Sequence, residues 1–412
     1  MTATDDPQSR IHAGLPAERP AVPRRTIVLL ALCAIVSHSL ARSTYPILLP
    51  AIEAELLRNH AQAGSLSTVN FGAYLAGVAV VTALSGRLEP IRVLYGGLAL
   101  AVAGFAVLSQ AGSYLQLAAG LALAGMSSAA IWNSTPVIAA SLVGPQRRGL
   151  VMGLLSSFMG LGIVAASQGT NLVRSLAGDD QVWRPIWVGA ASFAAVLLVL
   201  MGLFLRPPRT SRVSGGFSLA RLRLVPGWKM LTTSYLLSGL SVSSFTPFFG
   251  VALEEHGFSR HHVANLYSLF GLAAALTAVN LGRVSDRIGR RPVLLGAQAV
   301  VAGAALLVVT GTEPFATIAA MAFGAASFTF PVLVAAYLSD YLHGRELSNA
   351  LGALTLLYGI ALTAGPYLSG SVGDSAIGFN GVFTGVAAVN VAGALFISRL
   401  PRVGRPRLIT GS

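Results

Sequence analysis

Arg42 places a permanent cation inside a long apolar stretch of this sequence. His38 precedes it by four residues and Tyr45 follows it by three, so a helix carries all three on one stripe. Ionisable groups inside a membrane are costly and usually face a cavity or a partner. No Asp or Glu lies near the middle of any apolar stretch to neutralise Arg42. We predict that this stripe faces a cavity. The alternative is an arginine whose head extends to the nearby membrane surface.

An unpaired Arg42 in a cavity suits an anionic substrate such as a carboxylate, because guanidinium and carboxylate groups bind each other through two parallel hydrogen bonds. His38 is a candidate carrier of a coupling proton, since an unperturbed histidine has a pKa of about 6.5. A histidine that packs between helices explains the same residue equally well.

A second group of chemically capable side chains lies between two apolar runs and comprises Glu254, Glu255, His256, His261 and His262. Such side chains ligate metals, but on a predicted surface turn solvated charges are the commoner interpretation. The single cysteine, Cys33, lies inside an apolar run and offers no further ligand site. We therefore predict no metal and no cofactor. A membrane-embedded enzyme is the weaker alternative.

Residues 282–292, Gly-Arg-Val-Ser-Asp-Arg-Ile-Gly-Arg-Arg-Pro, form a charged stretch between two apolar runs. It is too short for a domain and too charged for hydrocarbon, so it predicts a tight turn at a membrane surface. Its arginines indicate the cytoplasmic side. Membrane topology alone explains these arginines, but it does not explain why the acid Asp286 lies among them. Free N–H groups at a helix start attract an anion such as this acid, and we predict that Arg290 pairs with Asp340.

The composition assigns the chain to a membrane, because 54% of its 412 residues are hydrophobic and only 10% are charged, against about a quarter charged in soluble domains. A spanning helix needs about 20 mainly apolar residues. Twelve segments meet this length, approximately 26–49, 62–86, 93–110, 114–143, 150–173, 185–205, 229–253, 263–283, 293–311, 315–341, 350–372 and 380–398.

The positions of the charges explain a formal net charge of +13 without nucleic acid. Most of the 28 basic residues lie in the tails, the middle linker and the loops of one side, as the positive-inside rule requires. An even number of spans returns both termini to the cytoplasm. Residues 1–25 are polar and lack the basic start of a signal peptide, so we predict a disordered cytoplasmic tail.

The polar stretch 206–228 divides the chain into two similar halves, 26–205 and 229–398, followed by a tail at 399–412. The segment Ser43-Thr44-Tyr45-Pro46 is echoed by Ser244-Phe245-Thr246-Pro247, and Gly86-Arg87 by Gly282-Arg283. The shared offset, close to half the chain, predicts two six-helix bundles related by an axis along the membrane normal. The predicted fold is therefore an all-α membrane protein of twelve transmembrane helices in two pseudo-symmetric bundles.

The pattern Gly-x-x-x-Asp-Arg-x-Gly-Arg-Arg at 282–291 resembles the loop motif of the major facilitator superfamily (MFS) of transporters. Residues 41–50, 61–70 and 72–77 are similar to the start of its YbfB/YjiJ-like branch. The resemblance implies an MFS fold and a cytoplasmic gate comprising Gly282, Arg283, Asp286, Arg287, Gly289, Arg290, Asp340 and Arg148. Two departures weigh against a typical proton-driven drug exporter: the fourth helix has Leu121 where those antiporters have an arginine, and the fifth helix lacks their Gly-Pro pair.

A mildly polar, aromatic pocket between the halves is predicted from helix identity. Its candidate residues are His38, Arg42, Tyr45, Asn70, Tyr74, Trp132, Asn133, Gln168, Asn171, Ser241, Phe245, Tyr337 and Tyr358. For any single residue of this set, hydrogen bonding between helices is the commoner role.

The function predicted is that of a permease in the cell (inner) membrane, not an enzyme. It moves a small organic solute, with an organic anion as the candidate, by alternating access. The sequence contains no Walker loop, so movement is driven by a gradient or is facilitative. The alternative is a proton-coupled efflux pump for amphiphilic compounds. The predicted partners are the bilayer, the substrate and a coupling proton, and the protein is expected to act as a monomer.

Overall fold

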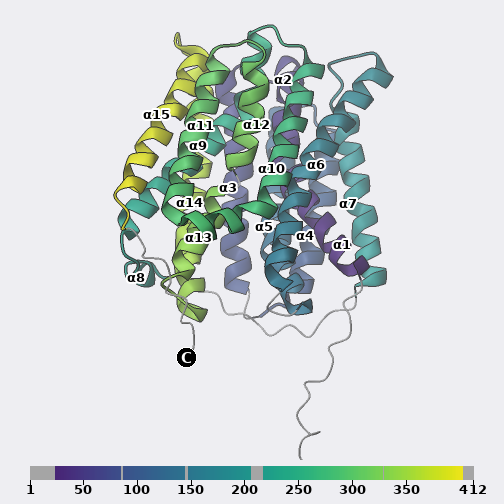
Figure 1. Ribbon diagram of the computed structural model, residues 1–412. Coiled ribbons are helices and arrows are strands. Elements are labelled where there is room, and N and C mark those ends of the chain that lie inside the picture. Colours follow the sequence, from purple (N-terminus) through teal and green to yellow (C-terminus); the bar gives the residue numbers. More distant parts are fainter. Residues whose placement is uncertain (1–23, 85–86, 144–146, 206–216, 328, 402–412) are drawn as a thin grey trace, which may run out of the picture.

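The structure is a computed structural model that describes residues 24–84, 87–143, 147–205, 217–327 and 329–401. The side chains at 279, 281–283 and 329 are also outside the description. Most of both predicted tails and about half of the predicted linker fall outside the described ranges. Within those ranges the regular structure is helical, and Figure 1 shows long helices running side by side.

Six spans form the N-terminal half. The first is a 33-residue rod in which α1 (Arg24–Ala34), the π-helix η3 (Ile35–Ser43) and α2 (Thr44–Leu56) are continuous. The other five are α3 (His60–Leu84), α4 (Pro90–Ser109), α5 (Tyr114–Leu142), α6 (Arg148–Ala177) and α7 (Arg184–Phe204).

Six spans form the C-terminal half, after the short helix α8 (Leu219–Leu222). They are α9 (Trp228–Glu255), α10 (Arg260–Ile288), α11 (Arg290–Val309), α12 (Phe315–Ser327) with α13 (Thr329–Ser339), α14 (Gly344–Gly373) and α15 (Gly378–Ser398). Eleven of the described spans are long and apolar enough to cross a membrane. The 29-residue α10 is the twelfth. The predicted twelve-helix fold is confirmed.

The predicted turn at 282–292 is shorter than the sequence suggested. Helix α10 continues to Ile288 and α11 begins at Arg290, so Gly289 alone makes the turn. Its φ of +96° is a conformation that glycine adopts most readily. Asp286, near the end of α10, and Arg290, at the start of α11, pair across this turn.

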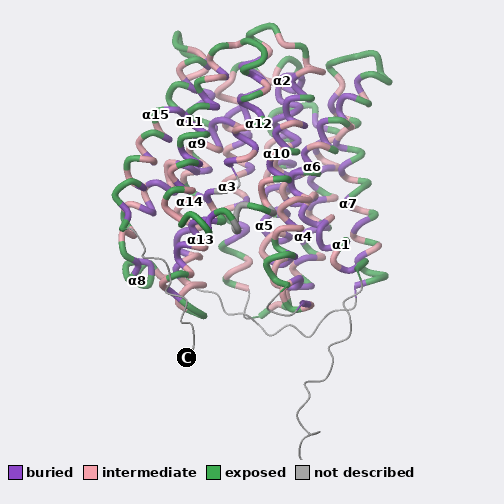
Figure 2. Tube along the Cα trace, viewed as in Figure 1, coloured by how far each residue is buried: buried purple, intermediate pink, exposed green. Residues whose placement is uncertain are grey.

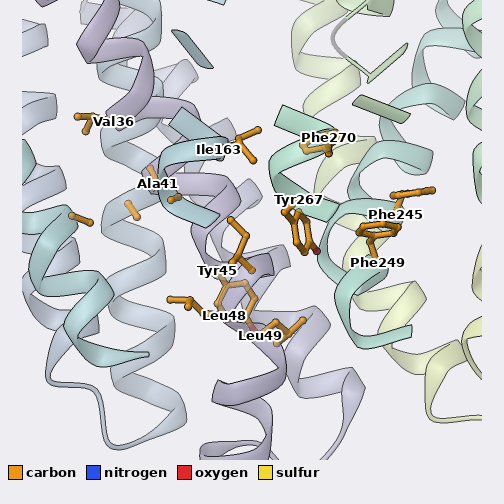
Figure 3. Close-up of a cluster of buried hydrophobic side chains, with 14 of the residues drawn as sticks. Val36, Ala41, Tyr45, Leu48, Leu49, Ile163, Phe245, Phe249, Tyr267 and Phe270 are labelled. Atoms are coloured by element: carbon orange, nitrogen blue, oxygen red, sulfur yellow. The ribbon is translucent and has the colours of Figure 1, made fainter. Parts of the chain in front are cut away.

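The apolar core runs through both halves, and the outward surface is also apolar. Figure 3 shows Tyr45, Leu48 and Leu49 facing Tyr267 and Phe249 across the boundary between the halves, all within one buried cluster. In Figure 2 the exposed residues lie mainly on the outside and at both ends of the bundle. Exposed large side chains such as those of Leu203, Leu276 and Leu395 suit contact with lipid.

The halves pack closely at the end of the bundle where α2 ends and α3 begins, which is uppermost in Figure 1. A Cβ atom added to Gly64 would overlap the carbonyl oxygen of Pro366, and one added to Gly370 would overlap that of His60. Small residues allow such approach where lipid gives no hydrophobic drive. We call this end the sealed face, and the opposite end, which carries α8, the linker face.

Candidate functional site

A cavity of about 400 Å³ lies between the two halves. Its walls come from η3, α3, α5 and α6 on one side and from α9, α10, α12, α13 and α14 on the other. Because both halves contribute, a rocking motion of one half against the other changes its shape and access.

Arg42 lies in the wall of this cavity, at the end of η3. Its guanidinium carbon is 4.7 Å from the ring centre of Phe71 and 4.5 Å from that of Tyr74. These cation–π contacts hold the guanidinium group without supplying a counter-charge. Among the described lining residues there is no Asp or Glu. The structure therefore places Arg42 at the cavity rather than at the membrane surface.

His38 lines the same cavity one helical turn before Arg42. Its Nδ1 is 3.0 Å from Ser37 Oγ, and its ring meets Trp132 edge to face with centroids 4.6 Å apart. Both His38 and Arg42 belong to η3, whose hydrogen bonds have the wider i to i+5 spacing, as between the Thr44 N–H and Ser39 O.

The wall from the C-terminal half is aromatic and mildly polar. Tyr235 and Tyr358 stack with ring centroids 4.2 Å apart and planes 12° apart. Thr246, Thr277 and Thr355 add hydroxyl groups from three different helices. An occupant of this cavity therefore meets one cation, several aromatic faces and a few neutral hydrogen-bonding groups.

Five of the residues predicted for the cavity line it, namely His38, Arg42, Tyr74, Trp132 and Tyr358. The structure does not bring the rest into the lining, and this corrects the prediction for Tyr45, Asn70, Asn133, Gln168, Asn171, Ser241, Phe245 and Tyr337.

The physical reason is that most of these polar groups are satisfied by neighbouring backbone or side chains. Asn70 Nδ2 donates to Ala41 O at 3.1 Å and to Leu121 O at 2.9 Å. The Tyr45 hydroxyl donates to Ala63 O at 3.1 Å. A buried amide or hydroxyl with such partners has no need of a polar cavity.

The C-terminal half and the boundary between the halves repeat this pattern. The Tyr337 hydroxyl donates to Pro226 O, and Ser241 Oγ accepts from Asn390 Nδ2. In the N-terminal half, Asn133 Nδ2 donates to a carbonyl of its own helix. Gln168 Nε2 donates to Ser268 Oγ at 2.7 Å, and Asn171 Nδ2 donates to Asn265 Oδ1 at 2.9 Å, both across the halves. Phe245 stacks on Phe323 with centroids 3.7 Å apart.

Sequence reasoning missed Phe71 and Tyr235. A usable signal existed for Tyr235, because Tyr235, Val242 and Thr246 all line the cavity and are spaced by seven and four residues. That spacing defines one face of a helix. Phe71 lies three residues before Tyr74 on α3 and could have been found in the same way.

The predicted gate forms an ion cluster, but within one half. Arg290 Nη1 is 2.5 Å from Asp286 Oδ1, Arg290 Nε is 3.4 Å from Asp340 Oδ2, and Arg290 Nη1 donates to Ser285 Oγ at 2.8 Å. The predicted pair of Arg290 with Asp340 is thus present. Asp286 pairs with Arg290 of its own half, and its part in closing the inner side stays a prediction.

The other predicted gate residues are placed as follows by the described part of the structure. Arg148 and Arg287 are exposed, and Gly289 forms the turn. Gly282 and Arg283 belong to α10, and their side chains are outside the description.

The sealed face joins the halves through an acid at a helix start. Asp374, after the end of α14, accepts the backbone N–H of His60 at 2.9 Å and that of Ala61 at 2.8 Å. These N–H groups begin α3, where orphan donors and the helix dipole favour an anion. Nearby, Thr68 Oγ1 donates to Thr363 O at 2.9 Å, again across the halves.

The acids and histidines at 254–262 lie on this face and form separate ion pairs. Arg260 Nε is 3.1 Å from Glu254 Oε2, His262 Nε2 is 2.7 Å from Glu313 Oε1, and His261 pairs with Asp180. In the described part of the chain, no three His, Cys, Asp or Glu residues are grouped to hold a metal ion.

Solved structures of similar shape are membrane transporters. The structure resembles the nucleoside transporter NupG with a TM-score of 0.73 at 14% identity, over 90% of this chain and 98% of that one. It resembles a bacterial homologue of the human lysosomal transporter Spinster, in an inward-facing, unoccupied conformation, with a TM-score of 0.67 at 16% identity, over 91% and 95%. At these identities the likeness shows the fold.

Relatives by sequence are also transporters. The chain is 29% identical over 245 residues to a probable transporter of Streptomyces coelicolor, which is 57% of this chain and 54% of that protein. It is 32% identical over 132 residues to the class C tetracycline resistance protein of Escherichia coli, 31% of this chain and 32% of that one. The chain thus spans about half the length of the first relative and a third of the second.

Residues 34–399 match the family described as the uncharacterised MFS-type transporter YbfB. This match covers both halves and every lining residue of the cavity. With the twelve-helix fold and the transporter relatives, it shows that the chain is a membrane transporter and not an enzyme. It belongs to the YbfB family of the major facilitator superfamily.

Proposed function

We propose that this transporter moves a small organic anion through the cavity by alternating access. The observation that carries the proposal is Arg42, a permanent cation in the cavity wall whose described neighbours supply no acid. A carboxylate or similar group on the substrate is the natural counter-charge, because a desolvated guanidinium needs a hydrogen-bonded anion.

The rest of the cavity supports an occupant with an apolar body. Tyr235 and Tyr358 present aromatic rings, and Trp132 stands beside His38. The volume of about 400 Å³ falls within the range of roughly 300–1,000 Å³ that is common for small-molecule sites. The ionised end of the substrate lies at Arg42 and its apolar part against the opposite wall.

The arginine distribution supports a cytoplasmic location for the linker face. Arg148, Arg287, Arg290 and Arg291 lie at this end, together with α8. With the opposite face sealed by contacts between the halves, the described state corresponds to one in which the cavity communicates with the cytoplasm. The predicted gate at Asp286, Arg290 and Asp340 then acts in the other state, when the linker face closes.

Uptake into liposomes tests the substrate class. Purified protein is screened against organic acids and neutral analogues, with a gradient and without one. Loss of one charge-assisted hydrogen bond costs about 1.5–3 kcal/mol, so Arg42→Gln is expected to weaken apparent affinity for the acid roughly 10- to 100-fold, and Arg42→Lys less. Arg58→Gln removes an exposed arginine far from the cavity and serves as the control. A wild-type response to acids in both Arg42 variants would sink the proposal.

A second candidate is proton-coupled efflux of amphiphilic compounds. It is favoured by the partial similarity to the tetracycline resistance protein. In this case an imposed pH gradient drives accumulation of amphiphilic dyes in inverted vesicles, and Arg42→Gln leaves that transport unchanged. Under the organic-anion proposal, the pH gradient drives no accumulation of the dyes, and Arg42→Gln reduces transport.

A further inference from the structure

Histidine is the cation in the ion pairs that cross between the halves on the sealed face. Among the described residues there are two such pairs. His60 Nε2, at the start of α3, lies 3.6 Å from Glu255 Oε1 at the end of α9. His261 Nδ1, at the start of α10, lies 3.1 Å from Asp180 Oδ1 in the loop after α6.

Arginine pairs on the same face behave differently, because they stay within one half. Arg184 Nη2 is 2.7 Å from Glu55 Oε1, both in the N-terminal half. Arg260 Nε is 3.1 Å from Glu254 Oε2, both in the C-terminal half. Arg260 also reaches the other half, because its Nη1 donates to the backbone oxygen of Asp180 at 3.4 Å. The carboxylates that form ion pairs across the halves, however, do so with histidines, whose charge depends on protonation.

The surroundings of His60 are acidic. Its Nδ1 is 2.6 Å from Glu53 Oε1, and its ring meets Phe379 of α15 edge to face at 4.8 Å. The titratable and charged groups around it are Glu53 on α2, Glu255 and then His256 at the end of α9, Asp374 after α14, and the exposed Arg58 just before α3. The side chain of His60 retains 25% exposure, so protons reach it from the sealed side.

The surroundings of His261 are of mixed charge. Its Nε2 is 3.2 Å from Ser175 Oγ of α6. The charged groups around the pair are Asp180, the buried Arg174 of α6, Arg260 on the same helix and Glu254 of α9. Protonated His261 adds the attraction to Asp180 that joins α10 to the other half.

We propose that His60 and His261 form a proton-binding site that closes the sealed face. When protonated, both imidazoles are cationic and attract Glu255 and Asp180 across the halves. When the imidazoles lose their protons the attraction is lost, and three carboxylates, Glu53, Glu255 and Asp374, are left around an uncharged His60. Closure therefore takes up protons, and opening releases them.

The inference rests on the alternating-access part of the proposed function and is independent of the substrate. Proton binding on this face shifts the equilibrium between two states of the cycle. An acidic medium on the sealed side keeps that side shut, and a neutral or alkaline one favours its opening.

The test measures the distance between the halves on the sealed face without substrate. Spin labels are attached at Leu115→Cys and Ile377→Cys, which are exposed and belong to different halves, with Cys33 replaced by Ser. Exposed pairs are worth up to about 1 kcal/mol each, or roughly fivefold. We expect the open-to-closed ratio to rise roughly fivefold from pH 5.5 to 8.5, with no such rise in the double variant His60→Asn, His261→Asn.

The controls separate this effect from general histidine chemistry. His262→Asn removes a histidine pair with Glu313 that lies within one half, so it is expected to keep the wild-type curve. Asp374 binds the backbone of His60, so its two hydrogen bonds survive in His60→Asn. If the double variant fails to fold, Asp180→Asn with Glu255→Gln removes the same pairs and is expected to flatten the curve.

A flat wild-type curve, or a wild-type curve in either double variant, overturns the proposal. Arg42→Gln is expected to keep the pH curve while losing the response to organic acids. Failure of the proton site and failure of the anion-transport proposal therefore give different results.

Discussion

The two faces of the bundle each place an aspartate near a helix end, but with different results. On the sealed face Asp374 accepts two backbone N–H groups at the start of α3, in the other half. On the linker face Asp286 pairs with Arg290, four residues along the chain in its own half. The comparison teaches that an acid beside a helix end joins the halves only where the other half presents free backbone donors to it.

Packing differs between the faces as well. The sealed face brings backbones together at Gly64 and Gly370, whereas a Cβ on Gly149, at the linker face, would meet nothing within 4 Å. Closure of the sealed face thus depends on close approach of the backbones and on a few directed polar contacts. The arginines of the linker face are mostly solvated, and solvated charges contribute little to closure.

The largest expected effect comes from a side chain added at the tightest contact. Gly64→Val overlaps the Pro366 carbonyl, and overpacking costs about 1–3 kcal/mol, so the closed-to-open ratio is expected to fall roughly 5- to 150-fold. Maleimide labelling of a cysteine at the buried Ser67, from the sealed side, measures this. Gly169→Val, where a Cβ meets nothing within 4 Å, is the matched control. Labelling at the wild-type rate in Gly64→Val would contradict the packing argument.

A smaller effect is expected from loss of the cap on α3. Asp374→Asn weakens two charge-assisted bonds to the helix start, at a cost of about 1–2 kcal/mol. Amide hydrogen exchange at residues 60–64 is expected to accelerate about 5- to 30-fold. Asp179→Asn is the control, because Asp179 Oδ1 accepts from Gln181 N within its own loop. Equal exchange in the two variants would show that Asp374 does not hold the halves together.

The smallest effect is expected on the linker face. The side chain of Asp286 is 65% exposed, so its pair with Arg290 contributes less than about 1 kcal/mol. Asp286→Asn is expected to leave exchange at the start of α3 unchanged. Labelling of a cysteine at Thr277, in the cavity, is expected to rise a few-fold. Without the charge of Asp286, the proposed gate holds the linker face closed less firmly in the alternate state of the cycle. An unchanged labelling rate together with unchanged transport would remove the gate proposal.

Helix α3 shows how far the candidate site could be predicted. Asn70 and Tyr74 stand four residues apart and were both expected in the cavity, yet only Tyr74 reaches it. The amide of Asn70 is taken up by Ala41 O of η3 and Leu121 O of α5. A sequence shows which face of its own helix a polar residue occupies, but not which neighbouring carbonyl lies within reach.

Arg42 illustrates the opposite case. Its cost in hydrocarbon and the lack of a nearby acid predicted a cavity, and the structure places it in one. That prediction needed only the energetics of a single charge. The π-helix that carries Arg42 and His38 could not be predicted in this way, because its wider turn depends on the helices that pack around it.

The sequence by itself determined the twelve spans, their division into two halves and the concentration of arginine at one end. These follow from the length of apolar runs and from the cost of moving charge across a membrane. Only the tertiary structure decided which polar groups meet a cavity, which meet a backbone, and which aspartate joins the halves. That choice depends on short-range geometry between helices far apart in the chain, and a hydrogen bond forms only where donor and acceptor come within about 3 Å.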